Sequence, residues 1–522
     1  MKQSIKILFA FLLTFCFTQC TDLDLLPEDA FTEDVIFQDI SAYRSYLAKV
    51  YGSFSLTGQD GPNGDADISI VNDEGFTSYI RVYWKAQELT TDEAVIGWTD
   101  AGIRDLHEHS WSSENQFMRV LYYRISLIVA IANDFLKQSE PEILQRNNIP
   151  QSDWAEIEAY RAEARYLRAM AYWHGLDFFR NIPLETSISA TPPEQANPLD
   201  VYTFIKNELI EIENLLPAPR ANEYGRVDQA ALWMLQSKLY LNAETMVGVN
   251  QYSECVETCN KVINAGYTLQ PNYQDLFLAD NNTSNEIIFA INSDGINTQN
   301  WGCTTFLVHG AIGGSMVSED YGVSGGWGGM RTTSSMVEKF PDVTGEIDKR
   351  AIFYTSGQTL EINDIGEFTQ GYAVPKYRNL DANGVAGSDP THVDTDYPMF
   401  RLGDAYLMYA EAVLRGGAGG STAVSISLIN DLRSRAYGNS EGHITEDELT
   451  LDFILDERVR ELYWEGSRRL DLIRYNQFTD QTVWPWKGGV QEGRLTEKHR
   501  DIFPIPASDL AANPNLLQND GY

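Results

Sequence analysis

Cysteine is scarce in this chain, with five residues in 522. Cys16 and Cys20 fall near the N-terminus, which leaves only Cys255, Cys259 and Cys303. An odd and sparse set argues against a disulfide framework. Cys255 and Cys259 lie four residues apart, on one face of an expected helix, and no histidine completes a metal site beside them. We therefore predict that they form a buried structural pair.

Signatures of common catalytic sites are also missing. The chain has no HExxH, no P-loop and no GxSxG motif, and its seven histidines do not cluster at metal-ligand spacing. With 74 acidic residues, two carboxylates at glycosidase spacing are expected by abundance alone. The adjacent pair Asp92 and Glu93 fits helix-start or turn chemistry, because neighbouring side chains point in different directions. We predict that the protein is not an enzyme.

Positive charge is in short supply. There are 39 basic against 74 acidic residues, a formal net charge of −35. Such a surface repels phosphates and anionic headgroups, so nucleic acid partners are not expected. The acidic residues are spread along the chain without a long single-sign run, which is typical of a solvated exterior. The balance favours a neutral or cationic ligand.

The one marked apolar run lies at the N-terminus and is short for a membrane span. Lys2 and Lys6 precede the run Ile7 to Phe17, a pattern that predicts a signal peptide over residues 1–19. No small-x-small cleavage site follows, but Cys20 stands where the run ends. We predict that Cys20 carries a lipid anchor. An ordinary secreted protein with an incidental cysteine is the alternative.

Apolar residues in the mature chain recur at helical spacing. Between Asp153 and Phe179 they fall at intervals of three and four, which predicts one buried helix stripe. Short polar, glycine or proline breaks separate the segments, and paired helices of this length are typical of a tetratricopeptide-like, all-α scaffold. The other expected helices are Ser126 to Lys137, Val201 to Leu216, Asp228 to Ala243, Tyr252 to Ala265, Leu402 to Leu414, Ser425 to Arg435 and Leu451 to Tyr463.

Two long regions interrupt the helical pattern, at about 58–110 and 271–396. Both are rich in glycine and aromatic residues. Long loops on a rigid scaffold commonly carry binding sites, and aromatic content of this kind is not typical of disorder. Ile287 to Ile291 is an expected short strand in the second region. We look for function in these two loop-rich regions.

Four motifs along the chain together indicate a family. They are EARYLRAMAYWHGLDFFRNIPL at 163–184, FRLGDAYLMYAEAVLR at 400–415, ERVRELYWEGSRRLDLIRY at 457–475 and FPIPASDLAANPNLLQNDGY at 503–522. In this order they resemble the SusD/RagB proteins. The resemblance implies one SusD-like domain over residues 20–522, built on tetratricopeptide-like helix pairs. It also implies an outer-membrane lipoprotein, anchored at Cys20 and facing the cell exterior, with a SusC-like TonB-dependent transporter beneath it.

The loops resemble those of starch-binding members of that family. The segment NDEGFTSYIRVYWKAQELTTDEAVIGWTD, from Asn72, resembles their first binding loop and carries Asp73, Arg81 and Trp98 at positions that contact glucan. The segments DGINTQNWGCTTFLVHG and GVSGGWGGMRTTSSMVEKF carry the two further aromatic positions, Trp301 and Trp327. The resemblance therefore implies that starch or malto-oligosaccharides bind to these five residues, with no cofactor.

One position departs from that pattern. The asparagine that helps to hold sugar hydroxyls in the family is Ala101 here, and Asp100 stands beside it. This leaves open a different glycan as the ligand, or a mainly structural role as a lid of the transporter.

The chemistry of these residue types agrees with sugar binding. A sugar ring packs its apolar C–H face on an aromatic plane, and its hydroxyls need directional donors and acceptors. Three tryptophans from separate loops could form a curved platform for a helical α-1,4-glucan, with Asp73 and Arg81 bonding hydroxyls at the rim.

A few further residues receive structural interpretations. Trp84, Trp464 and Trp484 lie in scaffold-like or unassigned sequence and are expected to pack in the interior. Asp280, Asn281 and Asn282 offer oxygen ligands for a structural calcium ion, although a solvated turn is the preferred interpretation.

Overall fold

The computed structural model describes residues 36–522, so the predicted signal peptide and Cys20 lie outside the described residues. Helices dominate this part of the chain, as predicted. None of the helices in residues 36–522 is long and apolar enough to cross a membrane.

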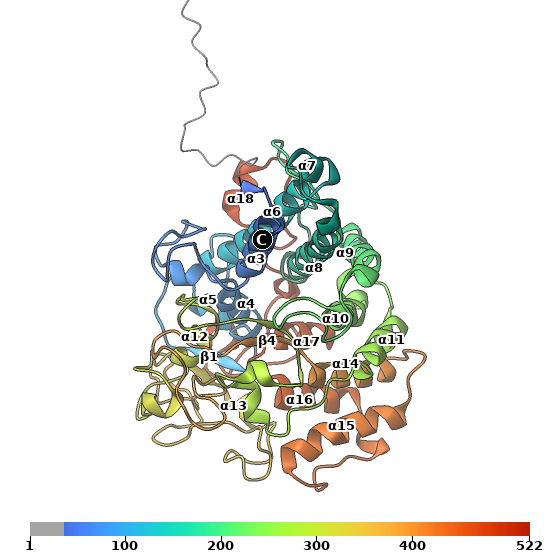
Figure 1. Cartoon of the computed structure of the whole chain (residues 1–522). Coiled ribbons are helices and arrows are strands. Elements are labelled where there is room, and N and C mark those ends of the chain that lie inside the picture. The colour runs from blue at the N-terminus through green and yellow to red at the C-terminus, as the bar shows by residue number, and fades with distance from the viewer. Residues whose placement is uncertain (1–35) are drawn as a thin grey trace, which may run out of the picture.

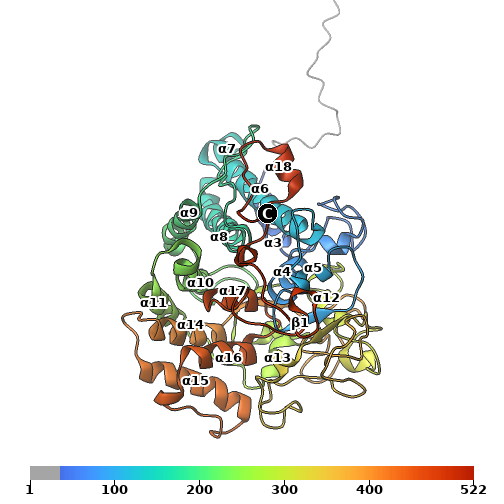
Figure 2. The same cartoon turned by 180° about the vertical axis from the view of Figure 1, so that it is seen from behind.

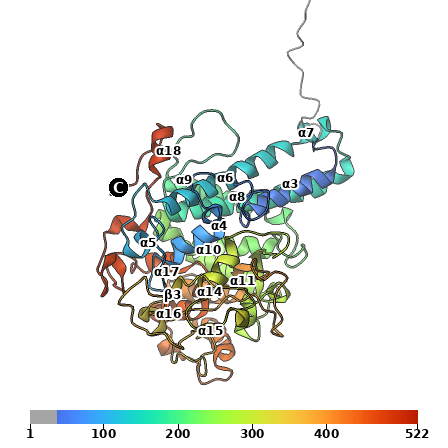
Figure 3. The same ribbon diagram turned by 90° about the vertical axis from the view of Figure 1, so that its left-hand side faces the viewer.

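The scaffold is an arc of antiparallel helices that pack on their neighbours along the chain (Figures 1 and 2). The prediction of a tetratricopeptide-like all-α scaffold is confirmed. α3 (Ile40–Gly52) lies beside the first two long helices of the arc, as Figure 3 also shows. The arc consists of α6 (Gln116–Gln138), α8 (Trp154–Phe179), α9 (Pro198–Ile212), α10 (Gln229–Val247), α11 (Tyr252–Ile263), α14 (Leu402–Leu414), α15 (Thr422–Tyr437) and α16 (Leu451–Leu462).

Local capping fixes where these helices begin and end. The Asp228 carboxylate accepts hydrogen bonds from the backbone amides of Ala230 and Ala231, which opens α10. Gly248 ends the same helix at a φ of 72°, a conformation that glycine adopts without a steric penalty. The Asn115 side chain caps α6 by accepting the backbone amide of Phe117. The helix therefore begins at Gln116, ten residues before the predicted start at Ser126.

Several helices were not predicted, α3 among them. α4 (Tyr79–Glu88) lies inside the first loop-rich region, and all of its residues are buried. Arg81, Lys85 and Glu88 fall on one face of this helix at helical spacing, and the structure buries these polar side chains as well. The remaining shorter helices are α5 (Arg104–Glu108), α7 (Pro141–Arg146), α12 (Cys303–Gly310), α13 (Ser334–Val337), α17 (Arg468–Arg474) and α18 (Ala507–Ala512).

Two small antiparallel sheets connect the loop-rich regions to each other and to the scaffold. β1 (Ala94–Ile96) of the first region pairs with β3 (Met330–Thr332) of the second. β2 (Ile287–Ile291), the strand predicted from the sequence, pairs with β4 (Tyr397–Arg401), which leads directly into α14. The two loop-rich regions therefore meet, although more than 200 residues separate their strands.

The predicted packing residues are in the interior. Trp84, Trp464 and Trp484 are buried, and the indole nitrogen of Trp84 donates to the carbonyl of Trp464 at 3.1 Å. Cys255 and Cys259 are buried free thiols with their Sγ atoms 4.0 Å apart, which confirms a structural pair.

Asp92 and Glu93 also serve the scaffold. The Asp92 carboxylate pairs with Arg468 at 2.6 Å, and a Glu93 carboxylate oxygen accepts the backbone amide of Trp464 at 2.9 Å. Both carboxylates are buried, and neither lines the groove described below.

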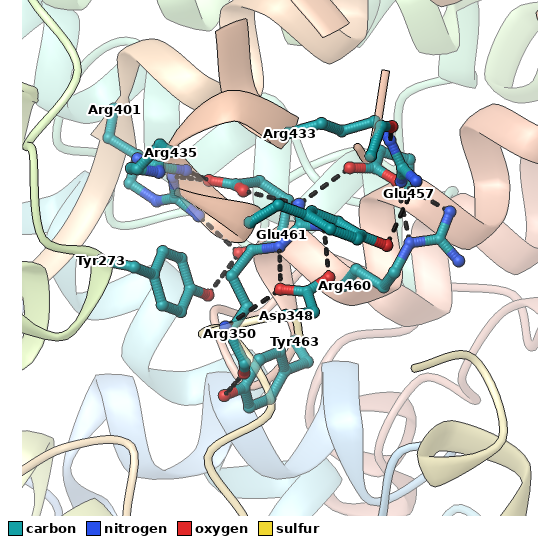
Figure 4. Close-up of polar contacts among 12 residues, drawn as sticks. Tyr273, Asp348, Arg350, Arg401, Arg433, Arg435, Glu457, Arg460, Glu461 and Tyr463 are labelled. Carbon is teal, nitrogen blue, oxygen red and sulfur yellow. Dashed lines mark hydrogen bonds and ion pairs between the residues drawn. The ribbon is translucent and has the colours of Figure 1, made fainter. Parts of the chain in front are cut away.

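Figure 4 shows a second feature of the interior, a cluster of arginines and carboxylates joined by hydrogen bonds and ion pairs. Arg350 contacts Asp348, Glu457 and Glu461 at 2.7, 2.8 and 3.1 Å. Arg401 contacts Glu461 at 2.6 Å. We call the full set the buried ion network; its members are Glu286, Asp348, Arg350, Lys376, Arg401, Arg433, Arg435, Glu457, Arg460, Glu461 and Glu465.

The buried ion network ties the second loop-rich region to the scaffold. Asp348 and Arg350 belong to that region, whereas Glu457 and Glu461 belong to α16. Isolated buried charges are costly, but every carboxylate here pairs with at least one arginine, and Glu457 and Glu461 each pair with three. The loops that carry Trp301 and Trp327 therefore extend from a firmly attached base.

Candidate functional site

The two loop-rich regions enclose a broad open groove with a volume of about 1080 Å³. All five binding residues named from the sequence line it, and the full lining is Asn63, Asn72, Asp73, Glu74, Phe76, Arg81, Gly97, Trp98, Thr99, Asp100, Trp301 and Trp327. The first region supplies most of these residues, and the second supplies Trp301 and Trp327.

The β1–β3 pairing brings Trp98 and Trp327 together. Trp98 follows β1 and Trp327 precedes β3, and in an antiparallel pair these ends lie side by side. The Trp98 indole nitrogen donates to the Trp327 carbonyl at 3.2 Å. A Cβ atom on Gly329 would lie 2.4 Å from the Trp98 indole, so only glycine permits this approach. Both tryptophans are half-buried, which leaves part of each ring facing the groove.

Trp301 is held at the start of α12 by contacts to α4 and its cap. Its carbonyl accepts a hydrogen bond from Arg81 Nη1 at 2.7 Å. The next residue, Gly302, approaches Ser78 so closely that a Cβ atom would lie 1.9 Å from that side chain. Cys303 then opens α12 at a φ of 47°, a conformation uncommon for a residue with a side chain. This constrained turn fixes the direction of Trp301.

The three indoles form a continuous arc. The ring centroids of Trp98 and Trp327 are 6.2 Å apart with an interplanar angle of 50°, and Trp301 and Trp327 have the same separation and angle. Trp327 is therefore the middle of the arc. Because each step turns the plane, the surface is curved rather than flat.

The structure corrects the position expected for Arg81. It is only 4% exposed and lies beneath the tryptophans rather than at the rim. Its guanidinium carbon is 5.8 Å from the ring centroids of both Trp98 and Trp327, and 4.9 Å from that of Phe306. Burial lowers the pKa of Arg81 to about 10, and Asp73 and Asp100 oppose this shift. Arg81 thus supports the platform from below.

Lys85, one helical turn further along α4, continues this layering. Its ammonium nitrogen lies 4.1 Å from the Phe117 ring centroid and 4.9 Å from that of Phe76. The side chain is fully buried, and its nitrogen has no hydrogen-bond partner among residues 36–522. Burial and the neighbouring Arg81 lower the pKa of Lys85 well below its usual value. Cations and aromatic rings therefore alternate beneath the groove.

Carboxylates and amides occupy the rim. Asp73 is exposed, and its Oδ1 accepts the backbone amide of Gly75 at 2.8 Å. Asp100 lines the groove, whereas Ala101 does not; the Ala101 carbonyl accepts from Gln116 at 2.6 Å.

Several lining residues were not named from the sequence: Asn63, Asn72, Glu74, Phe76, Gly97 and Thr99. They all lie in the first loop-rich region, and most of them are close in sequence to Asp73 or Trp98. That proximity is the signal that could have indicated them.

The residues considered for calcium have other roles. Asn281 is buried, and its amide donates to the carbonyls of Leu276 and Asp396 at 2.9 Å each. Asp280 accepts the backbone amide of Ala382 at 3.2 Å. Within residues 36–522 no group of three or more His, Cys, Asp or Glu side chains is arranged to hold a metal ion.

Scaffold and site together define a class of protein: tetratricopeptide-like helix pairs that carry an aromatic groove on long insertions. The sequence model of the SusD family matches residues 343–522. The chain is 34% identical to the starch-binding protein SusD of Bacteroides thetaiotaomicron, over 97% of this chain and 96% of that protein. It is 24% identical to SusD-like protein P2 of Formosa agariphila, over 83% and 87%. This chain belongs to the SusD family.

Solved structures show the same fold at lower sequence identity. Surface glycan-binding protein A of Bacteroides thetaiotaomicron, in complex with laminarihexaose, is 20% identical with a TM-score of 0.71 and covers 92% of this chain and 99% of its own. A SusD superfamily protein of Bacteroides vulgatus is 18% identical with a TM-score of 0.70, over 93% and 100%.

Proposed function

We propose that this protein captures starch and malto-oligosaccharides at the cell surface and passes them to a partner transporter. In this proposal the signal peptide is removed, Cys20 is lipidated, and the domain stands on the outer face of the outer membrane. A SusC-like TonB-dependent transporter takes up the bound α-1,4-glucan. The relative that is 34% identical is a starch-binding protein, which supports this choice of ligand.

The observation that carries the proposal is the arc of Trp98, Trp327 and Trp301. Successive ring planes turn by 50°, so successive glucose units of a helical chain can each meet a ring face. A flat, cellulose-like chain would fit such a curved surface less well. Asp73 and Asp100 at the rim then accept hydrogen bonds from sugar hydroxyls.

The groove is suited to binding without cleavage. It is open and shallow, so bound sugar keeps much of its water, and affinities of about micromolar to millimolar are expected. Repeated contacts along one polymer raise the effective affinity. The acidic pair Asp92 and Glu93 supplies no catalytic carboxylates, because both are buried in the scaffold and away from the groove.

A second candidate is a different glycan in the same groove. Its basis is one position at the rim, where Ala101 stands instead of the asparagine that the resemblance leads us to expect. The neighbouring Asp100 lines the groove, and Ala101 does not. A carboxylate accepts hydrogen bonds but cannot donate them, whereas an amide does both. Sugars that require a donor at this point would therefore bind less well.

Native gel electrophoresis in the presence of starch, pullulan, dextran or laminarin tests the proposal. We expect the protein to be retarded by starch and pullulan and to run freely in dextran. Retardation by laminarin alone would favour the second candidate, and no retardation by any glucan would contradict glucan capture and leave a lid role for the transporter.

A further inference from the structure

Two of the seven histidines in the chain lie against the tryptophan platform. The His309 ring stacks on Trp327, with centroids 4.9 Å apart and an interplanar angle of 16°. The His392 ring lies 4.7 Å from the centroid of Trp301 at 55°. Histidine is the side chain whose charge ordinarily changes in the physiological pH range. Trp327, the middle of the arc, thus rests on the ring of His309, and Trp301 at one end contacts the ring of His392.

The hydrogen bonds of His309 distinguish its two charge states. Nδ1 lies 2.6 Å from the carbonyl oxygen of Gly325, and Nε2 lies 2.8 Å from that of Thr391. A carbonyl oxygen can only accept. Neutral imidazole has one N–H group and can satisfy only one of the two carbonyls, whereas imidazolium donates to both.

These two carbonyls belong to the segments that set the position of Trp327. Gly325 is two residues before Trp327, in a glycine-rich loop, and Thr391 belongs to the segment that carries His392. The Trp327 backbone amide also donates to the carbonyl of His309 at 2.8 Å. Protonated His309 therefore joins its own helix, the Trp327 loop and the 389–393 segment.

We propose that His309 is a positioning residue whose protonation fixes Trp327 in the glycan-binding arc, so that glycan capture strengthens as the pH falls. This inference rests on the proposed function. The imidazolium state holds the loop from both sides, whereas the neutral state leaves one carbonyl facing a nitrogen lone pair. A platform that is already ordered loses less conformational freedom when sugar binds.

Burial of the imidazole ring places the transition of His309 on the acidic side. Burial lowers the pKa of His309 below its ordinary value of about 6.5, the carbonyls of Thr391 and Gly325 oppose this shift, and His392 adds to it. The Asp389 carboxylate accepts the backbone amides of Thr391 and His392. Arg81 lies across Trp327, 5.8 Å from the ring centroid. The gain in affinity is thus expected below about pH 6.5, and bound glycan should raise the pKa of His309 by linkage.

Calorimetric titration with maltohexaose between pH 8 and pH 5 tests the inference. For the unchanged protein, Kd should fall by about five- to tenfold as the pH is lowered, because a full unit of pKa shift on binding corresponds to a tenfold change. His309→Gln keeps a hydrogen-bond donor but cannot titrate in this range, so its Kd should be nearly independent of pH. His443→Gln removes an exposed histidine on the loop after α15 and should keep the pH dependence of the unchanged protein.

A second measurement does not depend on a variant that folds. In protein with isotope-labelled histidine, the His309 resonance should titrate at a higher pH with maltohexaose present than without it. Equal midpoints, or parallel pH profiles for the unchanged protein and His309→Gln, would overturn this inference alone. Absence of maltohexaose binding at every pH would overturn the proposed function.

Discussion

Buried cations have different neighbours in the buried ion network and beneath the groove. In the network Arg350 is fully buried and contacts three carboxylates at 2.7 to 3.1 Å, and its pKa is raised well above the usual value because these contacts outweigh the effect of burial. Beneath the groove Arg81 and Lys85 are also buried, but neither has a carboxylate partner within ion-pair distance among the described residues. Burial lowers the pKa of both.

This difference separates a structural cluster from a functional one. The network pairs its carboxylates with buried cations, so its charges compensate one another in the interior. The groove instead places aromatic rings over its cations and leaves the outer ring faces open. We therefore expect changes to the network to affect stability first, and changes to the groove to affect binding first.

The largest expected effect is on stability. Arg350→Met removes the ion partner of Asp348 and one of the three arginine partners of both Glu457 and Glu461, which leaves the buried Asp348 carboxylate without compensation. We expect the free energy of unfolding to fall by about 3 to 5 kcal/mol, which urea unfolding would measure. A stability equal to that of the unchanged protein would contradict the role assigned to the network.

Acid should weaken the network in a defined range. Burial alone would raise the pKa of Glu457, but Arg350, Arg460 and Arg433 lower it to about 2. A carboxyl group whose pKa is lower in the folded state stabilises the protein above its unfolded value and loses this effect as the pH falls. We expect stability to decline between about pH 4.5 and pH 2 by about 3 kcal/mol from this group. Glu457→Gln, less stable at neutral pH, should show a smaller decline when urea midpoints are compared across that range.

Removing a platform ring should act on binding. Trp98→Ala and Trp327→Ala each take away a ring face worth about 1.5 to 3 kcal/mol, so Kd for maltohexaose should rise about ten- to a hundredfold. Melting temperatures should fall less than for Arg350→Met. Trp233→Ala is the matched control, because Trp233 is half-buried on α10 and bonds Glu213, outside the groove. Normal binding by both platform variants would show that the arc is misplaced.

A smaller effect is expected from one added methyl group. In Gly329→Ala the new Cβ would lie 2.4 Å from the Trp98 indole, which must then move. We expect Kd to rise about three- to tenfold, a cost of about 1 kcal/mol. Gly325→Ala adds the same group in the same loop with no atom within 4 Å and should bind like the unchanged protein. Equal affinities for the two variants would argue against a fixed Trp98.

Much of the scaffold could be predicted because apolar residues recur at intervals of three and four along its helices. The spacing of apolar residues from Asp153 to Phe179 placed α8 within one residue of its observed start. α4 was missed because it is short and lies inside a region that was assigned to loops. The buried ion network could not be predicted from the sequence either, because partners such as Arg350 and Glu461 are 111 residues apart.

The site was named mainly through resemblance rather than through spacing. Nothing in the residues between Trp98 and Trp327 predicts that β1 pairs with β3, and this long-range pairing is what unites the indoles. The rim position expected for Arg81 was wrong because the loop pattern gave no sign of a buried helix at that point. His309 was overlooked because its two carbonyl partners become neighbours only after folding.

A crystal structure of the protein with bound maltoheptaose tests the central claim most directly. The account predicts successive glucose units against Trp98, Trp327 and Trp301, with sugar hydroxyls bonded to Asp73 at the rim. Arg81 should stay beneath the rings as their support. Sugar bound at another surface, with the three indoles free, would contradict it.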